Sequence, residues 1–170
     1  MKTTCALGLG SNLGDRLAYL QRAVEAIEAR GIEVRKLSPV YETEPVGFME
    51  QPRFLNAVSL AATDLDAHAL LAAVKAIERE LGRRPTFKGG PRVIDIDILF
   101  YEELVLDAEE LVIPHPGLHQ RAFVLVPLAD VAPDWFHPVL KRSVRELLAQ
   151  VKGREGVRLA GTVPLPKGMP

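Results

Sequence analysis

The sequence predicts an α+β fold in which helices cover one face of a mainly antiparallel β-sheet. Strand-like and amphipathic helix-like segments follow one another in the order β-α-β-β-α-β. The chain has 170 residues, of which 48% are hydrophobic, enough to bury one core. This order is the ferredoxin-like, or split βαβ, plan, followed here by a C-terminal extension. We expect a single domain over residues 1–160 and a loose tail over residues 161–170.

The first half of the chain contains three predicted strands and one helix. The strands are expected over residues 3–10, 32–41 and 54–62, where apolar residues alternate or run together. The helix begins after Asp15, a suitable N-cap, and ends at Gly31. Its apolar stripe consists of Leu17, Leu20, Val24 and Ile27.

The second half begins with the clearest helix, over residues 66–81, which Gly82 terminates. Farther along, residues 123–128 are apolar enough to be buried. A Ser-x-x-Glu capping box at Ser143 opens a short helix. Residues 157–159 are expected to add an edge strand. Three histidines are expected at the surface: His68, His119 and His137.

Between these parts lies a strand with one aliphatic and one acidic face. Isoleucines alternate with Asp95 and Asp97, so both carboxylates point to the same side, roughly 6.5–7 Å apart at Cα. Like charges held this close repel, and a cation between them would relieve the repulsion. Paired carboxylates suit Mg²⁺ that also carries substrate phosphates. An edge strand with a solvated acidic face is the alternative reading.

Two long loops rich in glycine and proline, residues 43–53 and 82–92, flank the acidic strand in the predicted fold. The second loop carries four cations: Arg83, Arg84, Lys88 and Arg92. Arginine matches phosphate oxygens bidentately and lysine acts as a point charge, so this loop is predicted to be a lid over an anionic ligand. A solvated basic loop is the alternative. The P-loop pattern is absent from the sequence.

Composition excludes several other function classes. Lys and Arg number 21 against 22 Asp and Glu, and a net charge of −1 gives no general attraction to nucleic acid or to an anionic membrane. Cys5 is the single cysteine, which rules out an internal disulfide. No segment resembles a signal peptide or membrane span, so a location in the cytoplasm is expected. A monomer is also expected.

The chain resembles the 6-hydroxymethyl-7,8-dihydropterin pyrophosphokinase family of folate biosynthesis nearly from end to end. The most specific element is Gly-Pro-Arg-x-x-Asp-x-Asp, residues 90–97. The other matching motifs are Gly8-Leu9-Gly10-Ser11-Asn12, Tyr41-Glu42-Thr43-Glu44-Pro45, Gln51-Pro52-Arg53-Phe54-Leu55-Asn56, Pro114-His115-Pro116 and Arg121-Ala122-Phe123-Val124-Leu125-x-Pro127-Leu128.

The resemblance implies that the hydroxymethyl oxygen of the pterin attacks the β-phosphorus of MgATP and that AMP leaves. It implies that Asp95 and Asp97 bind two Mg²⁺ ions and act in catalysis with Arg92 and the lid arginine Arg84. The ATP contacts implied are Arg84, Lys88, Arg92, Ile98, His115 and Arg121. The pterin contacts implied are Thr43, Glu44, Val46, Phe54, Asn56, Asp95 and Phe123. No residue stands out as a general base, so positioning and charge neutralisation should supply most of the catalysis.

The chain departs from the family pattern in its basic loop. Gly89 stands where many members have an aromatic residue, and the loop is about one residue shorter than in some relatives, which leaves the alignment of Arg83 and Arg84 open. Two other functions remain open at this point: a non-catalytic binding module of the same fold, and a metal-dependent phosphohydrolase. For Phe54 and Phe123, core packing is the alternative role.

Overall fold

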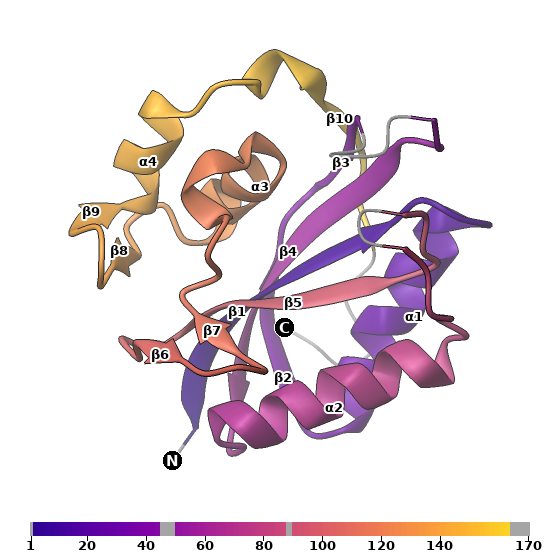
Figure 1. Ribbon diagram of the computed structural model, residues 1–170, viewed down its shortest axis with the longest axis horizontal. Coiled ribbons are helices and arrows are strands. Elements are labelled where there is room, and N and C mark those ends of the chain that lie inside the picture. The colour runs from indigo at the N-terminus through magenta and orange to yellow at the C-terminus, as the bar shows by residue number, and fades with distance from the viewer. Residues whose placement is uncertain (1, 45–49, 88–89, 164–170) are drawn as a thin grey trace.

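The computed structural model describes residues 2–44, 50–87 and 90–163. A six-stranded antiparallel sheet forms its centre, with the strand order β10-β3-β4-β1-β5 and with β2 also paired to β4 (Figure 1). The strands of this sheet are β1 (Thr3–Ser11), β2 (Glu33–Leu37), β3 (Val40–Thr43), β4 (Phe54–Thr63), β5 (Asp95–Tyr101) and β10 (Val157–Gly161). The prediction of a mainly antiparallel sheet is therefore confirmed.

Two helices, α1 (Arg16–Ala29) and α2 (Ala67–Glu80), pack side by side on one face of this sheet. The predicted N-cap at Asp15 is confirmed, and Asp66, expected as the first residue of the second helix, is the N-cap of α2; both carboxylates accept hydrogen bonds from backbone N–H groups three residues on. The predicted stripe of α1 is wrong at one position. Leu17 is 42% exposed, because it lies in the first turn, beyond the edge of the core.

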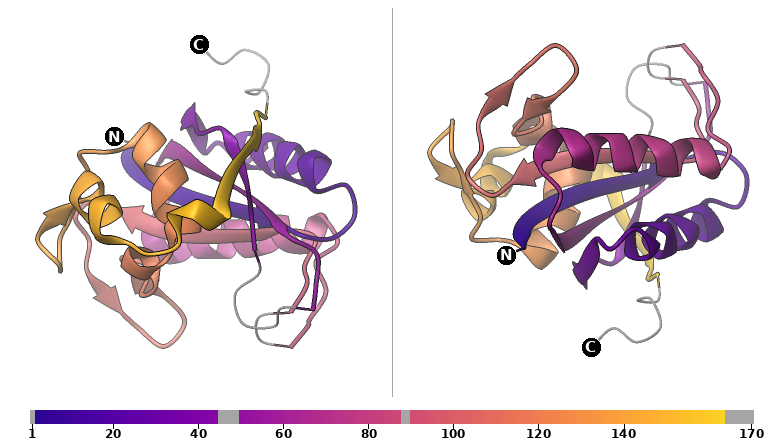
Figure 2. Two further views of the ribbon diagram at one scale, coloured as in Figure 1. Left: turned by 90° about the horizontal axis from the view of Figure 1, so that it is seen from above. Right: turned by 90° about the horizontal axis from the view of Figure 1, so that it is seen from below.

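The opposite face of the sheet is covered by α3 (Ala122–Val131), against which α4 (Val144–Gln150) packs. Figure 2 shows from two further sides that α3 and α4 lie apart from α1 and α2. The expectation that helices cover one face is thus right for α1 and α2 only. The C-terminal extension builds a second core there, in which α3 packs on Ala6, Val58 and Phe100.

The predicted strand over residues 32–41 is divided into β2 and β3, which lie one after the other along β4. The break falls at Ser38 and Pro39, because proline has no N–H to donate to a ladder. The Ser38 hydroxyl accepts a hydrogen bond from the Val58 N–H at 2.9 Å and donates to the Pro39 carbonyl at 2.8 Å. The segment between β2 and β3 therefore stays bonded to β4 across the break.

The C-terminal extension contains two small hairpins and two 3₁₀ turns. These are β6 (Leu106–Asp107) with β7 (Val112–Ile113), β8 (Phe136–His137) with β9 (Arg142–Ser143), Leu118–Gln120 and Arg154–Gly156. The predicted capping box at Ser143 is confirmed, since both of its hydrogen bonds are formed. The expected surface position of His137 is wrong, because its ring is buried edge-on against Phe100, which stacks on Trp135.

The end of the described chain remains packed beyond the expected boundary at residue 160. β10 runs to Gly161, and the Val163 side chain is buried in the core beneath α1 and α2. The rest of the expected tail, residues 164–170, lies outside the described residues. None of the helices in the described segments is long and apolar enough to cross a membrane.

Candidate active site

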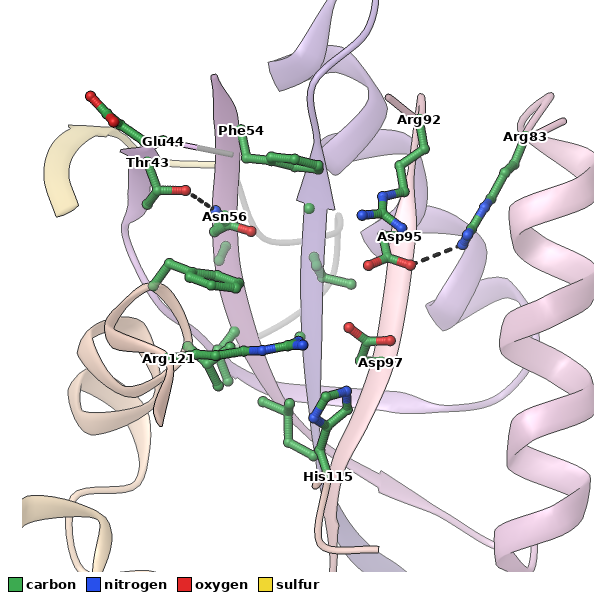
Figure 3. Close-up of a pocket in the computed structure, with 18 of the residues that line it drawn as sticks. Thr43, Glu44, Phe54, Asn56, Arg83, Arg92, Asp95, Asp97, His115 and Arg121 are labelled. Atoms are coloured by element: carbon green, nitrogen blue, oxygen red, sulfur yellow. Dashed lines mark hydrogen bonds and ion pairs between the residues drawn. The ribbon is translucent and has the colours of Figure 1, made fainter. Parts of the chain in front are cut away.

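A cavity of about 600 Å³ lies on the sheet face that carries α3. It is lined by residues of β1, β4 and β5, by the end of β3 and the start of α3, by the segments before β5 and α3, and by Lys75 of α2. The lining residues come from separate parts of the chain between residues 8 and 124. Figure 3 shows their side chains converging on one space.

One wall of the cavity carries Asp95 and Asp97 on the edge strand β5. The alternation of the strand is as predicted, because Ile96 and Ile98 are buried among α1 and α2 while both carboxylates face the cavity. On the neighbouring strand β1, Gly10 pairs with Asp95 and Gly8 pairs with Asp97. The floor beside each carboxylate therefore carries no side chain, which leaves room for a ligand.

The two carboxylates have different surroundings. Asp95 accepts a hydrogen bond from a guanidinium, whereas Asp97 has no hydrogen-bond or ion-pair partner among the described residues. Burial, followed by the charges of Asp95 and Glu78, raises the pKa of Asp97 to about 7. An unpartnered carboxylate beside a second one fits a divalent cation. No group of three or more potential ligands forms in the parts of the chain that are described, so such an ion needs further oxygens from a substrate.

The guanidinium beside Asp95 belongs to Arg83. Its Nη1 atom lies 2.9 Å from Asp95 Oδ1 and 2.8 Å from Glu78 Oε2. Glu78 is only 3% exposed, and its Oε2 atom also accepts the Ile96 N–H at 2.8 Å. Arg83 thus links the last part of α2 to the acidic strand at the rim of the cavity.

The opposite wall presents an amide and two aromatic rings, from Asn56, Phe54 and Phe123. The Asn56 side-chain N–H donates to Thr43 Oγ1 at 2.6 Å, which holds the amide in place (Figure 3). A Cβ added to Gly10 would lie 2.8 Å from the Asn56 side-chain oxygen. The glycine is therefore required for the amide to occupy this position. Such a slot suits a flat heterocycle with polar edges.

The other basic side chains of the cavity belong to Lys75, Arg92, His115 and Arg121. Arg92 is fixed by its backbone, whose N–H and C=O both bond to Asn12, and its guanidinium lies 5.4 Å above the Phe54 ring. Its buried Nε atom has no hydrogen-bond partner in the described segments. Burial and the Arg121 charge lower the pKa of His115, so its ring is neutral at pH 7.

Most of the predicted site residues line this one cavity: Thr43, Glu44, Phe54, Asn56, Arg92, Asp95, Asp97, His115, Arg121 and Phe123. Two do not. Ile98 is buried on the other face of β5, so only its backbone is available to a ligand, and the exposed Arg84 lines a neighbouring hollow. The cavity contains Arg83 instead. Val46 and Lys88 lie outside the described residues.

Sequence reasoning missed Glu78. Its position could have revealed it: Glu78 lies four residues after Val74, on the buried side of α2. A carboxylate is buried on such a face only if it is paired, so a cationic partner could have been expected. Arg83 was noted only as one of the loop cations, because the spacing of the loop left its alignment with Arg84 open.

Comparisons with known proteins identify the family of the chain. A model of the family described as 7,8-dihydro-6-hydroxymethylpterin-pyrophosphokinase (HPPK) matches residues 6–133. The chain is 44% identical over 143 residues to the 2-amino-4-hydroxy-6-hydroxymethyldihydropteridine pyrophosphokinase of Aquifex aeolicus, covering 84% of this chain and 89% of that protein. The protein of the same name from Methylorubrum extorquens is 47% identical over 150 residues, covering 88% of this chain and 94% of the relative.

Larger proteins also contain a similar region. The chain is 43% identical over 154 residues to the folic acid synthesis protein fol1 of Schizosaccharomyces pombe, covering 90% of this chain but only 21% of that protein. The crystal structure of Plasmodium falciparum HPPK-DHPS wild type with pteroate superimposes with a TM-score of 0.72 at 17% identity, covering 88% of this chain and 44% of that one. This last likeness concerns the fold alone. The family match over residues 6–133 and the identities of 44% and 47% show that the chain belongs to the 7,8-dihydro-6-hydroxymethylpterin-pyrophosphokinase family.

Proposed function

We propose that the chain transfers the pyrophosphoryl group of MgATP to 6-hydroxymethyl-7,8-dihydropterin. The hydroxymethyl oxygen forms a bond to the β-phosphorus, the bond from that phosphorus to the bridging α–β oxygen breaks, and AMP leaves with that oxygen. The observation that carries this proposal is one cavity with a carboxylate pair on one wall and an amide-aromatic slot on the other. A cation-phosphate group and a flat heterocycle bound there would face each other across it.

We assign the metal role to Asp95 and Asp97, as two ligands of Mg²⁺ that shares its remaining coordination with phosphate oxygens. Two ions, rather than one, follow from the family resemblance. When bound, Mg²⁺ neutralises charge on the triphosphate and orients it for in-line displacement. The Asp97 carboxylate supports this assignment, because it has no hydrogen-bond or ion-pair partner among the described residues and the charges of Arg121 and Lys75 offset only part of the rise in its pKa.

The cations of the cavity are assigned to the nucleotide. The orphaned Nε atom of Arg92 supports a polar contact with a ligand, because a buried donor left unpaired is costly. Arg121 enters from the start of α3, and the neutral His115 ring offers a hydrogen bond to ribose or phosphate. The contact with ATP that was predicted for Arg84 we transfer to Arg83, because Arg83 lies in the cavity.

The amide-aromatic slot is assigned to the pterin. Phe54 and Phe123 provide apolar faces for the ring, and the Asn56 amide provides hydrogen bonds to its edge. Thr43 acts on the ligand through Asn56, whose amide it orients. Rigid placement of both substrates is the main source of rate enhancement in this proposal, since charge neutralisation and alignment dominate phosphoryl transfer.

We also propose that the fold is ferredoxin-like and forms one domain. The order β5-β1-β4, with β2 and β3 together beyond β4, supports this if β2 and β3 count as one interrupted strand. Packing of α3 and β10 against the same sheet supports a single domain that includes the C-terminal extension.

Product analysis tests the proposed reaction. The protein is incubated with Mg²⁺, ATP and the hydroxymethyl dihydropterin, and nucleotides and pterins are separated by chromatography. We expect AMP and pterin diphosphate in equal amounts, and no AMP when the pterin is omitted. Asp97→Asn, which keeps the side-chain size, serves as the matched control and should lose most turnover. Release of free phosphate without pterin, or formation of ADP, would contradict the proposal.

A further inference from the structure

The contact between Arg83 and Asp95 places a fixed cation on one of the two proposed metal ligands. The Arg83 Nη1 atom is shared between Asp95 Oδ1 at 2.9 Å and Glu78 Oε2 at 2.8 Å. The side chains of Arg83 and Asp95 are 23% and 24% exposed, whereas that of Glu78 is 4% exposed. The pair therefore lies at the rim of the cavity and is anchored from its buried side.

Glu78 holds the guanidinium independently of Asp95. Its Oε2 atom accepts the Ile96 N–H at 2.8 Å, which fixes the carboxylate to the backbone of β5. The Arg83 backbone N–H in turn donates to the Glu78 carbonyl at 3.0 Å, after a turn in which Gly82 has a φ of +97°. Arg83 thus has a short, doubly fixed tether and remains beside the cavity when its bond to Asp95 breaks.

We infer that Arg83 is the internal counter-cation of Asp95, and that it makes loading of the carboxylate pair depend on a metal-polyphosphate complex instead of the bare metal ion. This inference rests on the proposed metal role of Asp95 and Asp97. A bare divalent ion must displace the guanidinium and then lies close to it, so the two cations repel each other. An ion that arrives with phosphate oxygens brings anions that pair with the displaced guanidinium.

Arg83 is therefore a positioning and selecting residue, and its removal has an unusual expected sign. A substitution that merely damages the site weakens metal binding. Removal of a competing cation strengthens it. The binding of bare Mn²⁺ separates these two cases, and it requires neither ATP nor pterin.

The experiment is a titration of the whole chain with Mn²⁺ in the absence of nucleotide, with free Mn²⁺ followed by electron paramagnetic resonance. For Arg83→Met we expect about 10-fold tighter binding than for the unsubstituted protein, which corresponds to one charge-assisted hydrogen bond at a partly exposed site. Arg83→Lys keeps the charge and should show a smaller gain. Arg79→Met removes an equal charge from an exposed residue near the end of α2, four residues before Arg83. Arg79 forms no ion pair with Asp95 among those described, so the affinity should change less than 2-fold, since exposed charges are screened.

The same titration is repeated with a non-hydrolysable ATP analogue present. The analogue should tighten Mn²⁺ binding more in the unsubstituted protein than in Arg83→Met, because only the unsubstituted protein has a displaced guanidinium with which the phosphate oxygens can pair. Unchanged or weaker bare Mn²⁺ binding by Arg83→Met, or an equal gain in Arg79→Met, would overturn the inference. Loss of bare Mn²⁺ binding in Asp97→Asn tests the metal site itself, so failure of the proposed function is distinguished from failure of this inference.

Discussion

Asp97→Asn is expected to stabilise the metal-free protein at pH 8, although it removes a proposed metal ligand. In the folded chain, burial and the neighbouring charges of Asp95 and Glu78 raise the pKa of Asp97 to about 7, from 3.8. Between these two pH values the folded state binds a proton that the unfolded state has already released. The free energy of unfolding therefore falls as the pH rises through this window, and the loss is complete above pH 7.

The magnitude follows from the size of the shift. At about 1.4 kcal/mol per pKa unit, a shift of about 3 units corresponds to about 4 kcal/mol at pH 8 and about 1.5 kcal/mol at pH 5. The Asp97 side chain retains some exposure, and solvent there screens part of the repulsion. We therefore expect a gain of about 2–4 kcal/mol for Asp97→Asn at pH 8 and of about 1 kcal/mol at pH 5.

Urea denaturation measures this gain at both pH values, in chelator and at fixed ionic strength. Only the difference between variant and unsubstituted protein is compared, because other groups titrate in both. Adding Mg²⁺ should reverse the order, since the ion then stabilises the protein that keeps both carboxylates. An equal gain at pH 5 and pH 8, or a loss at pH 8, would refute the argument that an uncompensated charge at Asp97 destabilises the fold.

Three other substitutions test the remaining features. Asn56→Ala should weaken pterin binding about 10- to 100-fold, because ring atoms lose their partner in a desolvated slot, while calorimetry should show unchanged affinity for an ATP analogue. Gly10→Ala should weaken pterin binding by about 10-fold, since its Cβ displaces the Asn56 amide; Gly156→Ala, where a Cβ meets open space, is the control that should bind normally. His137→Asn should flatten the acid dependence of stability. Burial lowers the pKa of the His137 imidazole, so the unsubstituted fold loses stability as the pH falls below about 6.5. Thermal melts at pH 5.5 and 7.5 measure this loss, and an equal drop in melting temperature in both proteins would contradict the prediction.

Local patterns in the sequence were enough to predict the elements whose residues depend on their near neighbours. The capping box at Ser143 and the N-cap at Asp15 each involve residues three apart, so they could be predicted without tertiary structure. The period-two pattern of β5 likewise identified its buried and open faces. The helical state of α3 was not predicted, because an apolar run with an internal Pro127 has no helical periodicity.

The site was predictable as a set of residues but not as an arrangement. The family motifs identified the carboxylate pair, Arg92 and Asn56, whereas the choice between Arg83 and Arg84 depends on the turn after α2. There Gly82 has a positive φ and the Arg83 N–H bonds back to Glu78, which turns Arg83 toward β5 and leaves Arg84 exposed. The conformation of this turn decides which guanidinium reaches Asp95, and no periodic pattern in the sequence indicates it.

The Gly-Ser-Asn segment at the end of β1 shows why a motif can be recognised before its role is understood. In the sequence it is a turn signal. In the structure Asn12 is 1% exposed, and it bonds the backbone of Arg92, the side chain of Gln51 and the carbonyl of Pro52. Asn12 thus joins the segment before β4, which leads into the amide-aromatic slot, to the segment before β5, which leads into the carboxylate pair. One buried amide, which forms no hydrogen bond with Asp95 or Asn56 among those described, therefore connects the segments that carry the two proposed binding regions.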